Sequence, residues 1–170
     1  MYTIDEIAAL VDRYSEDYSL LLKVCSWLEL SLVNSALFNF RDAIAHYRIY
    51  YEADRNGDRD TMIRQETSIV EHLHRGLRDG CCFILQNLKK GLFCEMNDNK
   101  YPDDMRRKLR KLLHKCKSFE LDLRKQSMIT DTEITRCFNN LSPLAGDILE
   151  LFAKNSLGHN FSKYSSKPDA

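Results

Sequence analysis

The sequence predicts an all-α protein, a compact bundle of five to six helices. Apolar residues near the N-terminus recur at alternating steps of three and four, which is the spacing of an amphipathic helix. Only three prolines and six glycines occur in 170 residues, a content typical of helical proteins. Since 44% of the residues are hydrophobic, the chain can bury a sizeable core. We expect a single helical domain over residues 1–154 and a flexible polar tail over residues 155–170.

The first two helices are predicted from capping residues and periodicity. Thr3 and Glu6 form a capping box, so the first helix begins there, and its periodicity continues through residue 33. The sequence then offers a break, and a second helix is expected from about residue 34 to residue 53. Turn-forming residues 54–58 end it.

The third helix is expected over about residues 61–93 and the fourth over about residues 103–125. Gly76 and Gly80 lie inside the third helix, where each costs about 1 kcal/mol relative to alanine. These glycines indicate either the close approach of a neighbouring helix or a kink.

The C-terminal part is predicted to form one or two shorter helices. Thr132 and Glu133 can open a short fifth helix. Ser142 followed by Pro143 has the pattern of an N-cap and a first helical residue, so a last helix is expected from there to about residue 154.

Charge and segment composition exclude several classes of protein. Twenty-five basic and 25 acidic residues cancel, so no overall charge attracts nucleic acid or a membrane surface. No apolar run approaches the roughly 20 residues that span a bilayer. Asp5 and Glu6 stand where a signal peptide carries basic residues. We therefore expect a cytoplasmic protein with reduced cysteines and without a membrane partner.

The candidate catalytic residues lie in the expected second helix, where Arg41 and His46 enclose four residues and Asp42 follows the arginine. A guanidinium can clamp a phosphate whose charge grows in the transition state. An imidazole can take a proton from a 2′-hydroxyl or return one to the leaving oxygen. Asp42 lies four residues before His46, where a carboxylate can orient the ring. The set suits cleavage of a phosphodiester.

The spacing of Arg41 and His46 raises a geometric problem. Five residues place them about 140° apart around a regular helix, so one helix does not easily aim both at one phosphate. Either the long arginine side chain swings round, or a second copy of the motif completes the site across a two-fold axis. The second solution predicts a homodimer.

This segment resembles the HEPN superfamily, small all-α proteins whose signature is Arg-x4–6-His with a polar residue after the arginine. Residues 41–46 match that core, and the layout of residues 1–95 is similar. The resemblance implies a metal-independent endoribonuclease, homodimeric, in which paired motifs line a cleft and the 2′-hydroxyl of RNA attacks the adjacent phosphate. It implies that Arg41 stabilises the phosphate, His46 is the acid/base and Asp42 gives polar support. Such proteins are common in toxin–antitoxin, phage-defence and CRISPR-associated systems, so a protein antitoxin or effector is a further expected partner.

A second RNA contact is predicted on the fourth helix, where basic residues outnumber acidic ones. The candidates are Arg106, Arg107, Arg110 and Lys111. A solvated helix face explains the same residues. The cysteines and histidines lack the paired spacing of zinc sites, so we expect neither a metal nor a cofactor.

The alternative function is a non-catalytic helical module that binds nucleic acid or regulates a protein partner. The arrangement of Arg41 and His46 discriminates the two hypotheses. The enzyme hypothesis places two copies of the pair facing a shared cleft, whereas the module hypothesis leaves them scattered or tied into structural contacts.

Overall fold

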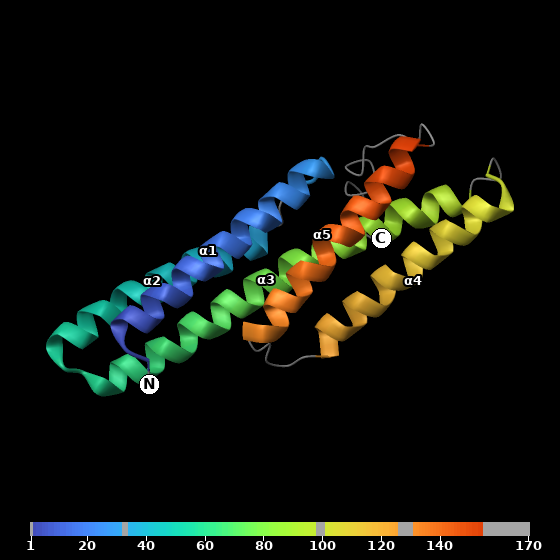
Figure 1. The fold of residues 1–170 in the computed structure, drawn as a ribbon. Coiled ribbons are helices and arrows are strands. Elements are labelled where there is room, and N and C mark those ends of the chain that lie inside the picture. The colour runs from blue at the N-terminus through green and yellow to red at the C-terminus, as the bar shows by residue number, and fades with distance from the viewer. Residues whose placement is uncertain (1, 32–33, 98–100, 126–130, 155–170) are drawn as a thin grey trace. The chain divides into compact units, whose positions relative to one another are not determined.

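A computed structural model describes residues 2–31, 34–97, 101–125 and 131–154, although the side chains of residues 131–139 and 152–154 lie outside this description. The described residues form helices without any strand, so the all-α prediction is confirmed. The helices, shown in Figure 1, are α1 (Ile4–Trp27), α2 (Asn34–Asn56), α3 (Arg59–Met96), α4 (Asp103–Lys125) and α5 (Asp131–Lys154). The expected tail over residues 155–170 lies outside the described residues.

The chain divides into two compact units. Unit 1 contains Met1–Leu21 and Leu32–Gly80, and unit 2 contains Leu22–Ser31 and Cys81–Ala170. Both α1 and α3 therefore contribute residues to each unit. The single domain expected over residues 1–154 stays a prediction.

Unit 1 is a packing of α1, α2 and the first part of α3. The backbone N–H of Thr3 donates to Glu6 at 2.7 Å, and that of Glu6 donates to the Thr3 hydroxyl at 3.3 Å, so the capping box is confirmed. The Tyr2 N–H donates to Glu66 of α3 at 2.9 Å. Buried side chains from all three helices form the core: Ile7, Val11, Tyr14 and Tyr18 from α1, Ala36, Ala43, Tyr50 and Ala53 from α2, and Met62, Ile69, Leu73 and Leu77 from α3.

The two glycines of α3 lie where neighbouring helices approach closely. A Cβ atom on Gly76 would meet the Tyr18 hydroxyl, the Ala36 carbonyl oxygen at 3.0 Å and Asn39 Cβ at 3.0 Å. A Cβ atom on Gly80 would meet the side chain of Leu21 at 2.8 Å. Of the two explanations for these glycines, the structure therefore supports close approach.

The turn between α2 and α3 makes these helices neighbours in unit 1. α2 runs to Asn56, slightly farther than predicted, and Gly57 follows it with a φ of 68°. The Asp58 N–H donates to the Ala53 carbonyl at 3.0 Å and the Gly57 N–H to that of Asp54 at 3.1 Å, as in a Schellman motif. This short reversal places residues of α2 opposite residues of α3.

The prediction that the first helix continues through residue 33 is wrong, because α1 ends at Trp27. Here too a Schellman motif stops the helix. The Leu30 N–H donates to the Cys25 carbonyl at 2.9 Å, and the Glu29 N–H donates to that of Ser26 at 3.1 Å. Glu29 has a φ of 54°, a conformation that glycine usually adopts. Because a glutamate stands at this position, the sequence does not show where the helix ends.

The predicted break at Ser142 and Pro143 is also wrong, because α5 is continuous with Pro143 inside it. Proline in a helix interior costs about 3 kcal/mol, since it removes one backbone hydrogen bond. The Pro143 ring is exposed, while its neighbours Leu141, Leu144 and Ala145 are buried. The packing of this apolar face keeps the helix intact.

In unit 2, α4 and α5 contact each other. The buried face of α4 is apolar apart from Glu120, which is hydrogen-bonded to Lys89, Gln86 and Arg124. The Lys115 ammonium lies 3.8 Å from the Asp147 carboxylate across the α4–α5 contact.

Candidate functional site

The sequence-predicted residue His46 lies at a contact between α2 and α3 in unit 1. Its ring is partly buried, and a 2.6 Å hydrogen bond joins its Nδ1 to Oε1 of Gln65 on α3. A second imidazole, that of His72 on α3, stacks beside it. The ring centroids are 5.2 Å apart and the ring planes differ by 19°. The structure thus places two half-buried histidines side by side.

The second imidazole is held in the same way as the first. Nδ1 of His72 lies 3.0 Å from Oδ1 of Asn39 on α2. Each histidine is therefore fixed by a side-chain amide of the opposite helix. An amide oxygen only accepts hydrogen bonds, so Nδ1 of each neutral ring carries the proton. Nε2 of each ring is then the nitrogen with a lone pair for a substrate proton.

The electrostatic surroundings disfavour the charged form of His72. Burial, followed by the repulsion from His46, lowers the pKa of His72 below its ordinary value. Asp42 and Glu71 oppose this shift, and Arg75 adds to it. The neutral imidazole is therefore the form that the site favours at His72.

Arg41 takes part in contacts within its own helix. Its guanidinium donates to one carboxylate oxygen of Asp42 from Nη2 at 2.8 Å and from Nε at 3.1 Å, and it lies 5.0 Å from the centre of the Phe38 ring. The hydrogen bonds from Arg41 lower the pKa of Asp42. Both partners are accessible, with 69% of the Arg41 side chain and 39% of the Asp42 side chain exposed.

Among the predicted catalytic residues, the structure joins Arg41 to Asp42 and places His46 in a separate set of contacts. The hydrogen bond that orients the His46 ring is donated by its Nδ1–H to Oε1 of Gln65. Asp42 acts on His46 and on His72 only through the field of its charge.

Three residues were not assigned to this site from the sequence: Asn39, Gln65 and His72. The sequence does carry a signal for them, because Asn39 and His46 are seven positions apart on α2, and Gln65 and His72 are seven apart on α3. When two antiparallel helices each carry two polar residues that lie two turns apart on one face, each residue of one helix can pair with a residue of the other. His74, the histidine nearest to His72 in the sequence, instead packs against Tyr14, with the two ring centroids 5.6 Å apart.

The basic residues predicted to bind RNA divide into two kinds on α4. Arg107, Arg110 and Lys111 are exposed, whereas Arg106 is partly buried. The exposed three lie outside the buried apolar face of the helix. They are free to contact a phosphate backbone.

Nothing else that we find among the described residues resembles a catalytic centre. No group of three or more histidine, cysteine or acidic side chains among them is arranged to hold a metal ion. A groove between α4 and α5 contains side chains of both charges, among them Lys115, Asp122 and Asp147.

Comparisons with protein-family models, curated proteins and solved structures find no match for this chain. The HEPN resemblance therefore stays a prediction that depends on the motif of residues 41–46. None of the described helices has the length and apolar character that crossing a membrane requires.

Proposed function

We propose that the protein is a metal-independent endoribonuclease of the HEPN type. The observation that carries the proposal is the His46 imidazole, which is partly buried and fixed at Nδ1 by Gln65. A ring held in this way presents Nε2 for proton transfer, as a general acid or base requires. The 2′-hydroxyl of the substrate attacks the adjacent phosphate, and the products are a 2′,3′-cyclic phosphate and a 5′-hydroxyl.

Arg41 binds the phosphate in this proposal after exchanging its partner. Both side chains of its ion pair with Asp42 are exposed to solvent, and such pairs contribute only about 0–1 kcal/mol to the stability of the folded protein. A phosphate dianion or diester can therefore replace the carboxylate and accept the same two N–H donors. Asp42 holds the guanidinium in place until the substrate arrives.

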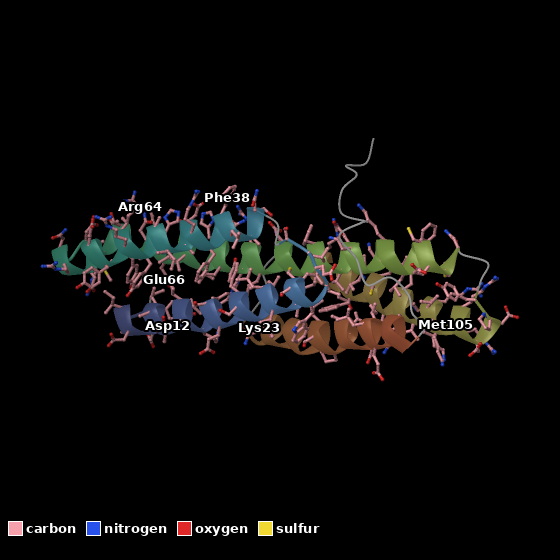
Figure 2. The ribbon with its side chains drawn as sticks, turned by 90° about the horizontal axis from the view of Figure 1, so that it is seen from above. Asp12, Lys23, Phe38, Arg64, Glu66 and Met105 are labelled. Carbon is pink, nitrogen blue, oxygen red and sulfur yellow. The ribbon has the colours of Figure 1, made fainter. Side chains whose placement is uncertain are left out.

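The protein is proposed to act as a homodimer through the outer face of α2. This helix exposes large apolar side chains that each have more than 40% of their surface accessible: Leu37, Phe38, Ile44, Ile49 and Tyr51. Phe38 projects outward from α2 in Figure 2. Exposed apolar clusters of this kind mark interaction surfaces. Because Arg41 is also exposed on this helix, pairing of two copies there would bring two Arg41 side chains together.

The decisive experiment is cleavage of a mixed single-stranded RNA pool in the presence of EDTA. Wild type is expected to release fragments that end in a 2′,3′-cyclic phosphate, and His46→Ala is expected to lose at least about 100-fold in rate, the contribution of one acid/base group. His114→Ala removes an exposed histidine of α4 and is the matched control. The absence of cleavage, or full activity of His46→Ala, contradicts the proposal.

The oligomeric state has its own test. Phe38→Asp and Ile49→Asp are expected to convert a dimer into a monomer in sedimentation velocity. Leu121→Asp, at an apolar residue of α4 that is 52% exposed, is the control and leaves the dimer intact. A wild-type monomer at all concentrations contradicts the proposed interface.

A non-catalytic nucleic-acid-binding module is the second candidate, and the exposed basic side of α4 favours it. If the protein binds RNA without cleaving it, charge reversal of Arg107, Arg110 and Lys111 should weaken binding and flatten its salt dependence. In the enzyme, the same change affects substrate affinity more than the rate of the bound complex.

The cellular role that accompanies the enzyme is that of a toxin or a phage-defence protein, controlled by a protein antitoxin or effector. Expression of the wild type should then arrest bacterial growth, and His46→Ala should relieve the arrest. Growth at the normal rate with active wild type contradicts this role but leaves the enzyme activity in place.

A further inference from the structure

We infer that His72 is the second acid/base residue of this site, so that one protomer supplies both groups that move protons. The inference rests on the proposed function and deepens it. Its basis is the pairing of two imidazoles by two reciprocal hydrogen bonds between α2 and α3.

The geometry suits two proton transfers at one phosphodiester. The rings lie 5.2 Å apart and nearly parallel. The Nδ1 atom of His46 is hydrogen-bonded to the amide oxygen of Gln65, and that of His72 to the amide oxygen of Asn39. Both rings are partly accessible. Cleavage requires one group to accept a proton from the attacking oxygen and another to donate one to the leaving oxygen.

The charges on and around the pair give the two rings different tasks. A positive charge on one ring disfavours a second positive charge on the other, because the ring centroids are only 5.2 Å apart. An acid and a base at one site need one charged ring and one neutral ring at the same time. Arg75 and the burial of His72 favour its neutral form, against the opposing charges of Asp42 and Glu71. His72 is accordingly the base and His46 the acid.

The reaction balances with these two residues. Nε2 of His72 takes the proton of the 2′-hydroxyl as the bond between O2′ and phosphorus forms. The bond between phosphorus and O5′ breaks, and the protonated Nε2 of His46 gives its proton to O5′. His72 ends protonated and His46 neutral, and exchange of protons with water restores the starting state.

This assignment changes what the second copy of the chain must provide. With both imidazoles in one protomer, the acid and the base do not have to come from two chains. A second copy is then needed only for further phosphate contacts, such as those of its Arg41.

The experiment compares two substrates in EDTA: the dinucleotide UpA and uridine 3′-(p-nitrophenyl phosphate). Because p-nitrophenolate leaves without a proton, the aryl ester needs a base but no acid. We expect His72→Gln to lose at least about 100-fold on both substrates. His46→Gln should lose as much on UpA and remain within about fivefold of wild type on the aryl ester. His74→Gln, two residues along α3, is the matched control and keeps both activities.

Each outcome is decisive. Nearly full activity of His72→Gln on UpA, together with an inactive His46→Gln, overturns the inference and leaves the proposed function standing. Loss of the aryl ester activity in His46→Gln and its retention in His72→Gln also overturns the assignment of the base. A wild type that cleaves neither substrate refutes the proposed function and the inference together.

A second variant guards against misfolding of His72→Gln. Asn39→Ala keeps the His72 imidazole and removes the acceptor of its Nδ1 hydrogen bond. The rate on UpA should fall, and the acidic limb of its pH–rate profile should move, because that limb reports the base. An unchanged rate and profile would show that the ring does not act in the reaction.

Discussion

Replacing Gly76 by alanine tests how tightly α3 is packed in unit 1. The new methyl group would meet the Tyr18 hydroxyl, and it would lie 3.0 Å from both the Ala36 carbonyl oxygen and Asn39 Cβ. Tyr18 is only 4% exposed and the Ala36 oxygen belongs to the backbone, so neither can move freely. Overpacking of this kind costs about 1–3 kcal/mol. With three close neighbours we take the upper part of that range, about 2–3 kcal/mol. Alanine in a helix gains about 1 kcal/mol over glycine, so we expect a net loss of about 1–2 kcal/mol.

Urea denaturation followed by circular dichroism measures this change, and Gly146→Ala is the matched control. Gly146 lies in α5 with nothing within 4 Å of an added Cβ. The same substitution should therefore stabilise the protein there by about 0.5–1 kcal/mol, through helix propensity alone. If Gly76→Ala is as stabilising as Gly146→Ala, the close approach of α1 and α2 to this point of α3 is wrong. Asn39 also accepts the hydrogen bond from His72. If the protein cleaves RNA as proposed, Gly76→Ala should therefore lower the cleavage rate even under conditions in which the variant is fully folded.

Three further predictions concern a helix end, a buried carboxylate and an imidazole. Glu29→Gly should raise stability by about 1 kcal/mol in urea denaturation, because it relieves a left-handed backbone conformation, and a loss of stability would contradict the Schellman end of α1. Burial raises the pKa of Glu120, yet hydrogen bonds from Lys89 and others outweigh it and lower the pKa. Stability should therefore fall as the pH drops through about 4.5, and Glu120→Gln should reduce that loss. The pKa of His72 is lowered in the folded protein, so stability should also fall as the pH drops below about 6.5. In NMR titrations His46→Gln should raise the pKa of His72, and an unchanged value would show that the rings do not interact.

The helices with clear periodicity and strong caps could be predicted from the sequence. α4 has the predicted bounds because an acidic first turn, a continuous apolar face and a basic last turn agree with one another. Where a helix boundary was predicted from one residue type alone, the structure differs from the prediction. Pro143 does not start a new helix, because burial of Leu144 and Ala145 outweighs the missing backbone hydrogen bond. Glu29 ends α1 in a conformation that glycine usually takes, so no residue type announced the end.

The site shows the same division between local and tertiary information. That Arg41, Asp42 and His46 share one helix could be predicted from the sequence, because spacing along a helix is a local property. Which of these groups contact one another depends on the packing of α2 against α3. The reversal at Gly57 brings α3 against α2, so that His46 stacks on His72 while the exposed Arg41 stays with Asp42. Contacts between helices depend on how their faces pack and rotate, which no single segment of the chain encodes.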